Sequence, residues 1–164
     1  PLFTTNLAQT LNKMHQTGTS RPQRLQTHTA DTGPDCHGKR ILLVEDNPLN
    51  MEIACELIGM TGAVIEEATD GEAALTKIRQ APENYYDLVF MDMQMPRLNG
   101  YDATKAIRNL PRQDVKKLPI IAMTANAFLD DIKKEREAGM NAHITKPFHL
   151  EELFAVISKW LRCK

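Results

Sequence analysis

The sequence is poor in the features that mark several protein classes. Its 164 residues hold three cysteines and no CxxC pair, so we expect free thiols in a reducing compartment, without a zinc site or a disulfide framework. No apolar run approaches the ~20 residues of a transmembrane helix, and no signal peptide is recognisable. The net charge of −1 gives no overall reason to expect nucleic acid or an anionic membrane as a partner.

The first part of the chain differs in composition from the rest. Residues 1–15 have apolar side chains at helical spacing, and we expect either a short helix or the remnant of an upstream domain. These side chains are Phe3, Leu7, Leu11 and Met14. Residues 16–38 contain one large aliphatic side chain, Leu25, which predicts a flexible linker. Because the chain begins with Pro1, we expect it to be part of a longer protein.

Residues 39–164 predict one α/β domain. Five apolar runs are each followed by a helical pattern, and runs such as ILLV, LVFM and IIAM are apolar at successive positions. A strand that is apolar on both faces is typical of a parallel sheet covered by helices on both sides, so we expect a doubly wound five-stranded sheet. The expected strands are 40–45, 63–68, 87–92, 118–125 and 141–147. The expected helices lie between Asn47 and Gly62 and at 70–81, 100–110, 128–139 and 150–161.

Polar side chains stand where four of these strands end. Glu45 and Asp46 follow the first strand, Asp92 ends the third, Thr124 ends the fourth, and Lys146 follows the fifth. Ligands of open parallel sheets bind at the carboxyl ends of the strands, so these side chains are expected to meet. A single acid at a strand end is usually structural. Three together repel one another, by roughly 4 kcal/mol for a pair about 4 Å apart, and call for a cation such as Mg²⁺.

A carboxylate beside Mg²⁺, a lysine and a hydroxyl group is an arrangement suited to phosphoryl transfer. In this interpretation Asp92 attacks phosphorus and carries the phosphoryl group as an acyl phosphate. The metal and Lys146 neutralise the phosphoryl oxygens, and Thr124 donates a hydrogen bond to one of them.

Four motifs strengthen this interpretation, namely LLVEDNPLN, DLVFMDMQMPRLNGYDAT, PIIAMTANA and HITKPF. With them the segment from about residue 39 to residue 161 resembles the receiver domain of two-component response regulators. The resemblance implies the strand order 2-1-3-4-5 and makes Asp92 the phosphoacceptor, which takes a phosphoryl group from a phosphohistidine. It makes Glu45 and Asp46 the Mg²⁺-binding acids, with Asp92 and the backbone carbonyl of Gln94 as further ligands.

The same resemblance makes Thr124 the switch hydroxyl and Lys146 the phosphate-pairing lysine. The family often has a cis peptide before the position of Pro147, which the sequence leaves open. Where the family often has an aromatic switch residue, this chain has His143, either as a switch residue or as a half-exposed strand residue.

The segments DNPLNMEIACELI and MTANAF look most like receivers fused to hybrid sensor histidine kinases. That likeness implies a histidine kinase or a histidine phosphotransfer protein as partner. It also implies a cytoplasmic location, possible attachment to a membrane-anchored sensor, and no direct contact of this segment with nucleic acid or membrane. The domain itself would be a self-phosphorylating switch and not a turnover enzyme.

Three other functions fit the sequence less well. An Asp-dependent phosphatase of the haloacid-dehalogenase type would need an acid two residues after its nucleophile, where this chain has Gln94. A flavodoxin-like cofactor binder would need a small-residue phosphate loop after the first strand, where this chain has the acidic EDNPLN. A degenerate receiver that serves only as an interaction module would have lost an acid or the lysine, and none is missing.

Overall fold

The computed structural model describes residues 33–163. The strands are β1 (Arg40–Val44), β2 (Val64–Ala68), β3 (Leu88–Asp92), β4 (Ile120–Thr124) and β5 (Ala142–Thr145). The helices are α2 (Pro48–Gly59), α3 (Gly71–Gln80), α4 (Gly100–Arg108), α5 (Asp114–Lys117), α6 (Leu129–Ala138) and α7 (Leu150–Leu161). The predicted helix in residues 1–15 and most of the predicted linker lie outside the described residues, so this division stays a prediction.

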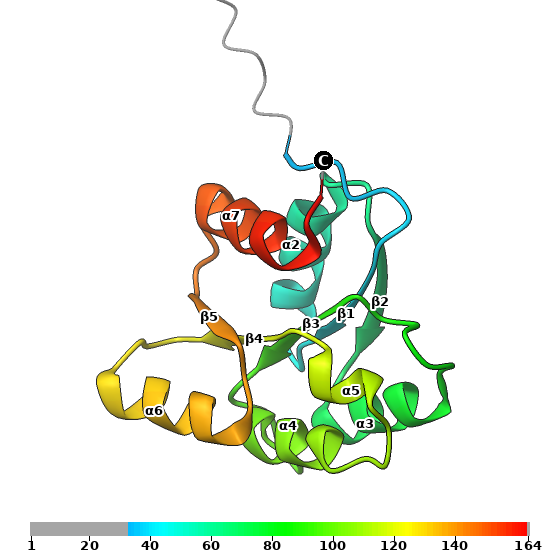
Figure 1. Cartoon of the computed structure of the whole chain (residues 1–164). Helices are drawn as coiled ribbons and strands as arrows, with labels where there is room; N and C mark the ends of the chain where they lie inside the picture. Colours follow the sequence, from blue (N-terminus) through cyan, green and yellow to red (C-terminus); the bar gives the residue numbers. More distant parts are fainter. Residues whose placement is uncertain (1–32, 164) are drawn as a thin grey trace, which may run out of the picture. The chain divides into compact units, whose positions relative to one another are not determined.

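The five strands form one sheet in which all neighbours are parallel, in the order β2-β1-β3-β4-β5. This confirms the predicted class and strand order. Helices α2 and α7 cover one face of the sheet, whereas α3, α4 and α6 lie on the other side with α5 beside them (Figure 1). Among residues 33–163, no helix is both long and apolar enough to span a bilayer.

The continuous apolar runs arise because each central strand is buried on both faces. In β1, Ile41 and Leu43 belong to the apolar cluster that includes side chains of α2 and α7. Leu42 and Val44 belong to the opposite cluster, with side chains of α3 and α4. Successive side chains of a strand point to opposite faces, so both faces need apolar residues.

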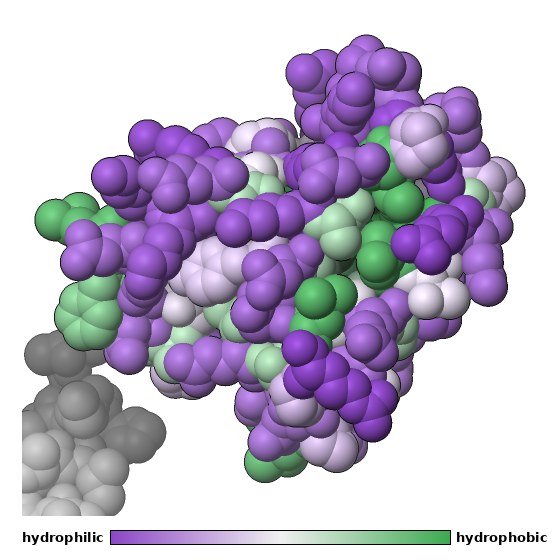
Figure 2. Space-filling model, turned by 90° about the horizontal axis from the view of Figure 1, so that it is seen from below, coloured by the Kyte–Doolittle hydropathy of each residue, from purple (hydrophilic) through white to green (hydrophobic). Residues whose placement is uncertain are grey.

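The helices on the same side of the sheet as α3, α4 and α6 turn hydrophilic side chains toward solvent. Figure 2 shows the molecule from below, where these helices lie, and its surface there is mostly hydrophilic with scattered apolar side chains. Phe128 and Leu129 at the start of α6 are exceptions, with exposed fractions of 66% and 85%.

Two local features position the loops that follow β1 and β3. The side chain of Asn47 accepts hydrogen bonds from the backbone N–H groups of Leu49 and Asn50, so it caps α2 immediately after the acidic pair. At the start of α4, Gly100 packs against the backbone of Asp92 and Met93. A Cβ atom at Gly100 would lie 3.0 Å from the Cα atom of Met93 and still closer to the carbonyl oxygen of Asp92.

The prediction of free thiols was wrong for two of the three cysteines. Cys36 and Cys163 form a disulfide across a sequence separation of 127 residues, whereas Cys55 is free. Cys36 is buried, and its N–H donates a hydrogen bond to the carbonyl of Thr61. Cys36, near the end of the predicted linker, therefore packs on the domain, and the thiol-based argument for a reducing compartment fails for this pair. Sequence spacing could not reveal that the two ends of the domain meet.

Candidate functional site

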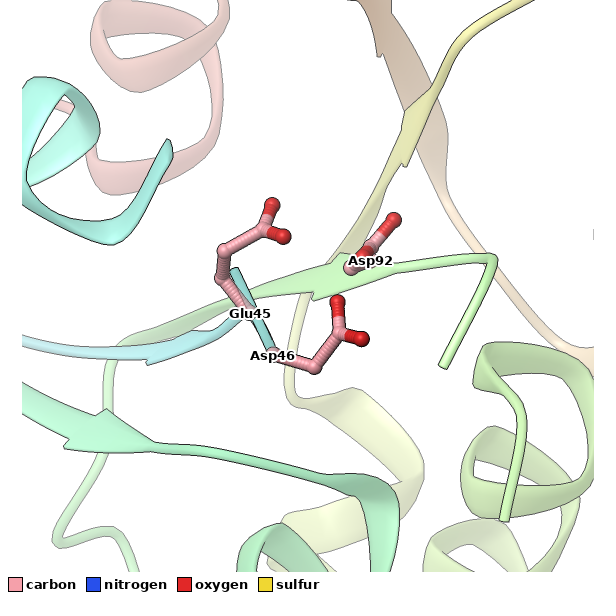
Figure 3. Close-up of side chains that lie close together, drawn as sticks. All are labelled: Glu45, Asp46 and Asp92. Carbon is pink, nitrogen blue, oxygen red and sulfur yellow. The ribbon is translucent and has the colours of Figure 1, made fainter. Parts of the chain in front are cut away.

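Three carboxylates meet at the carboxyl edge of the sheet. Glu45 and Asp46 directly follow β1, and Asp92 is the last residue of β3, which pairs with β1 (Figure 3). Each carboxylate offers an oxygen that lies within 4.8 Å of an oxygen of the other two. Glu45 and Asp92 are 1% and 3% exposed, whereas Asp46 is exposed to solvent. The structure thus confirms the predicted proximity of the three acids.

Lys146 brings a positive charge to this cluster from the end of β5. Its Nζ atom lies 2.6 Å from Oε2 of Glu45 and 3.1 Å from Oδ1 of Asp92. Burial acts to lower the pKa of Lys146, but the hydrogen bonds and charges of Glu45 and Asp92 outweigh it and raise this pKa. The lysine is therefore charged and offsets part of the repulsion between the acids.

The environment of Asp92 disfavours its negative charge. Burial, together with the charge of Glu45, raises its pKa to about 6, although Lys146 and a hydrogen bond from the backbone N–H of Gln94 act in the opposite direction. That N–H donates to Oδ1 of Asp92 over 3.3 Å. A further cation near these oxygens would favour the ionised carboxylate, which is the nucleophilic form.

Thr124 stands at the end of β4, next to the strand that carries Lys146. The backbone N–H of Lys146 donates to the carbonyl of Thr124 over 2.8 Å. The hydroxyl of Thr124 is 2.6 Å from the carbonyl of Asn126, to which it donates, and it accepts from the N–H of Asn126 at 3.2 Å. The hydroxyl is therefore engaged within its own loop, and its contact with a phosphoryl group stays a prediction.

Two residues that flank the cluster were named from the sequence. The side chain of Gln94 is exposed, and its backbone carbonyl remains a predicted metal ligand. The Lys146–Pro147 peptide bond is cis, which answers the question that the sequence left open.

His143 lies on β5 and is half-exposed, and it also contacts an acidic side chain on α6. Its Nδ1 atom is 3.3 Å from Oε2 of Glu135 on α6, and its side chain is 30% exposed. Glu135 is not among the site residues predicted from the sequence. A signal was present, because Glu135 shares one helical face with Ile132 and Ala138 at spacings of three, and an acid on such a face needs a partner.

The cluster of acids suits a hard divalent cation. All its donors are carboxylate oxygens, and it contains no thiolate or imidazole of the kind that zinc prefers. Two of the carboxylates are buried, and the single charge of Lys146 offsets only part of the repulsion among the three acids. Magnesium fits this set of donors.

Comparisons with known proteins agree with this geometry. The sequence matches the family model described as "Response regulator receiver domain" over residues 41–158. It is 36% identical to "Probable histidine kinase 2" of Oryza sativa subsp. indica over 131 residues, which cover 73% of this chain and 12% of that protein. It is also 36% identical to "Sensor protein GacS" of Pseudomonas syringae over 134 residues, which cover 80% of this chain and 14% of that protein.

Solved structures give the same result. The receiver domain of sensor histidine kinase PA1611 from Pseudomonas aeruginosa, described with a magnesium ion coordinated in its active site cleft, superposes with a TM-score of 0.68 at 36% identity. That match covers 76% of this chain and 98% of the other. Chemotaxis protein CheY4 of Vibrio cholerae superposes with a TM-score of 0.69 at 25% identity, covering 75% and 98%. The chain therefore belongs to the response regulator receiver domain family.

Proposed function

We propose that this chain is a phosphoryl-accepting switch or relay in which Asp92 takes a phosphoryl group from a phosphohistidine. The observation that carries the proposal is the convergence of Lys146 on Glu45 and Asp92 beside a third carboxylate at the carboxyl edge of the sheet. The proposal is supported because Asp92 lies beside a group that can neutralise charge, and positioning and charge neutralisation account for most of phosphoryl-transfer catalysis.

The reaction forms one bond and breaks one. A carboxylate oxygen of Asp92 attacks phosphorus, the P–N bond to the donor imidazole breaks, and the imidazole nitrogen keeps the electron pair. The product is an acyl phosphate on Asp92. Lys146, already 3.1 Å from Oδ1 of Asp92, remains close enough to pair with a phosphoryl oxygen on that carboxylate.

The carboxylates of Glu45, Asp46 and Asp92, together with the backbone carbonyl of Gln94, would hold Mg²⁺. When bound, the ion neutralises phosphoryl oxygens and lowers the repulsion between the donor and the acidic cluster. Glu45 contributes in a second way, because it positions Lys146 through a 2.6 Å contact.

Thr124 would report the phosphoryl group to the rest of the domain. Its hydroxyl must leave the carbonyl of Asn126 before it can donate a hydrogen bond to a phosphoryl oxygen. That exchange of acceptors changes the loop between β4 and α6. Phosphorylation would shift the equilibrium between two states that differ in this contact, because the phosphoryl group interacts differently with each state.

The relatives supply the proposed context. The chain spans 12% and 14% of the lengths of the rice and Pseudomonas relatives, so a parent chain with histidine kinase activity is part of the proposal. In that context a histidine kinase or a histidine phosphotransfer protein is the donor or the acceptor. A cytoplasmic location belongs to the same proposal.

The test is labelling with a small phosphodonor such as acetyl phosphate in the presence of Mg²⁺. Intact-protein mass spectrometry should show one added phosphoryl group, which hydroxylamine removes. The Asp92→Asn variant should gain none, whereas the matched control Asp130→Asn, which changes an exposed aspartate on α6, should label normally. Equal labelling of Asp92→Asn and the unmodified chain would contradict the assignment, and so would labelling that survives chelation of Mg²⁺.

A further inference from the structure

A second group of titratable side chains lies between α6 and β5. Glu135 on α6 is only 4% exposed, and its Oε2 atom is 3.3 Å from Nδ1 of His143 on β5. Its other oxygen, Oε1, is buried and has no hydrogen-bond partner among the described residues. A buried carboxylate with an unpaired oxygen is costly, so the charge of its neighbour decides how well it is tolerated.

The surroundings offer Glu135 little other compensation. A cavity of about 260 Å³ adjoins the pair, and its lining is partly apolar. The lining residues are Ile132, Glu135, Arg136, Met140, Asn141, Ala142 and His143. The nearby titratable groups on packed elements are Asp131 on α6 itself and Tyr101 and Arg108 on α4. The guanidinium of Arg108 donates to the carbonyl of Gly139 and to Oδ1 of Asn141, and among residues 33–163 it makes no ion pair with Glu135. Arg136 is exposed at the edge of the cavity and makes no ion pair with Glu135 in the described part of the chain.

The direction of the pKa shifts agrees with this geometry. Burial raises the pKa of Glu135, the positive charge of His143 lowers it, and the negative charge of Asp131 raises it again. The pKa of Tyr101 is raised by burial and by the charges of Asp131 and Glu135, so the same negative field reaches α4. His143 is therefore the cation whose charge offsets the burial of Glu135.

We propose that Glu135 and His143 form a proton-dependent clamp that sets how firmly α6 is held against β5. With a protonated imidazole the pair is a partly buried ion pair. Once the imidazole loses its proton, the buried carboxylate no longer has a cationic partner, and the two elements are held less firmly.

The position of the clamp gives it a functional consequence. Helix α6 begins five residues after Thr124, and His143 precedes Lys146 by three residues on the same strand segment. The clamp thus joins the helix that follows Thr124 to the strand that precedes Lys146. A change in its charge state alters the resistance of α6 to movement without any change at the carboxylate cluster.

The pH dependence follows from the two charges. The clamp is strongest where Glu135 is ionised and His143 is protonated. It weakens as pH rises and the imidazole is deprotonated, and it also weakens in acid, where Glu135 takes up a proton. Imidazole is the side chain that changes charge most readily near neutral pH, which is why pH is the variable of the test.

Amide hydrogen exchange of the whole 164-residue chain, free of metal and phosphoryl group, tests the clamp. After correction for intrinsic exchange, local opening of α6 should increase about fivefold from about pH 5.5 to about pH 8.5, as expected for an ion pair worth about 1 kcal/mol. Glu135→Gln and His143→Gln should remove this pH dependence. The controls Glu137→Gln on the same helix and His149→Gln, both at exposed positions, should retain it.

A second readout separates the clamp from simple packing. The side-chain carboxyl-carbon shift of Glu135, followed by nuclear magnetic resonance, should show a step near neutral pH that disappears in His143→Gln. A pH-independent α6, or a step that persists in His143→Gln, would overturn the proposal. Should His143→Gln fail to fold, the comparison of Glu135→Gln with Glu137→Gln decides alone. The measurements need no labelling of Asp92, so failure of the clamp and failure of the proposed function are distinguishable.

Discussion

The ammonium group of Lys146 lies 2.6 Å from a carboxylate oxygen of Glu45, although 101 residues separate the two in the sequence. The same ammonium is 3.1 Å from Asp92, so one lysine contacts both Glu45, a proposed metal ligand, and Asp92, the proposed phosphoacceptor. A divalent ion bound by these carboxylates must share their oxygens with the lysine. Metal binding and the position of Lys146 are therefore expected to be coupled.

Replacement of Lys146 by methionine tests this coupling. The Lys146→Met variant should bind Mg²⁺ about tenfold more tightly, because a competing positive charge is removed, and tenfold is about 1.4 kcal/mol. Calorimetric titration with Mg²⁺ measures the change, and Lys134→Met, at an exposed position on α6, is the matched control. Unchanged or weaker Mg²⁺ affinity in Lys146→Met would show that the ammonium does not compete with the metal.

The raised pKa of Asp92 predicts a specific dependence of stability on pH. Its folded-state pKa is about 6 against an ordinary value of 3.8, so the folded protein binds this proton more tightly than the unfolded chain. The free energy of unfolding should therefore fall as pH rises from about 4 to about 6 on account of this group.

Asp92→Asn removes that dependence. In chelator at about pH 7.5 it should be more stable than the unmodified chain by about 1 to 3 kcal/mol, measured by denaturant unfolding. Added Mg²⁺ should reduce this difference in the free energy of unfolding, because it stabilises the unmodified chain by mass action. Asp130→Asn should behave like the unmodified chain, and a destabilised Asp92→Asn in chelator would rule out the repulsion described here.

Thr124→Ala should uncouple the phosphoryl site from α6. With the phosphoryl mimic beryllofluoride, amide chemical shifts of the unmodified chain should change in residues 124–135 and 142–149 as well as near the cluster. Thr124→Ala lacks the hydroxyl that would change its hydrogen-bond acceptor from the carbonyl of Asn126 to a phosphoryl oxygen. The shift changes in residues 124–135 and 142–149 should therefore become smaller, while Mg²⁺ binding persists. Thr76→Ala, at an exposed position on α3, is the control. Changes confined to residues 45–50 and 92–96 in the unmodified chain would mean that no switch operates.

The fold and the acidic cluster could be predicted because both depend on local patterns. A central parallel strand must be apolar on both faces, so the third strand was expected at 87–92 and is found at Leu88–Asp92. The ends of parallel strands meet at one edge, so Glu45, Asp46 and Asp92 could be brought together without knowledge of any contact.

Features that depend on contacts between distant segments could not be predicted in this way. The helical spacing shows that Glu135 shares a face with apolar side chains and needs a partner, but its pairing with His143 depends on how α6 packs on β5. The short helix α5 was missed because a four-residue helix gives no periodic signal. It follows Arg112, whose side chain pairs with Asp114 at 2.6 Å and donates to carbonyls at the carboxyl end of α3, those of Ile78 and Ala81.

The Cys36–Cys163 disulfide is the clearest case of such a distant contact, and it leads to the last prediction. It closes a loop of 127 residues, and loops of this size give a disulfide its largest effect on the entropy of the unfolded chain. Loss of the bond should lower the free energy of unfolding by about 2 to 4 kcal/mol. Denaturant unfolding with and without dithiothreitol measures this loss, and Cys36→Ser should reproduce it in the absence of reductant.

Cys55→Ser is the matched control, because Cys55 is the free cysteine of the described chain and its thiol donates a hydrogen bond to the carboxylate of Glu67. Its pKa is raised to about 11 by burial and by Glu67, so it is a poor nucleophile for disulfide exchange near neutral pH. Cys55→Ser should therefore retain the full effect of dithiothreitol. A titration that finds three reactive thiols in the unreduced, unfolded chain, or equal stability with and without reductant, would show that the two ends of the domain are not covalently joined.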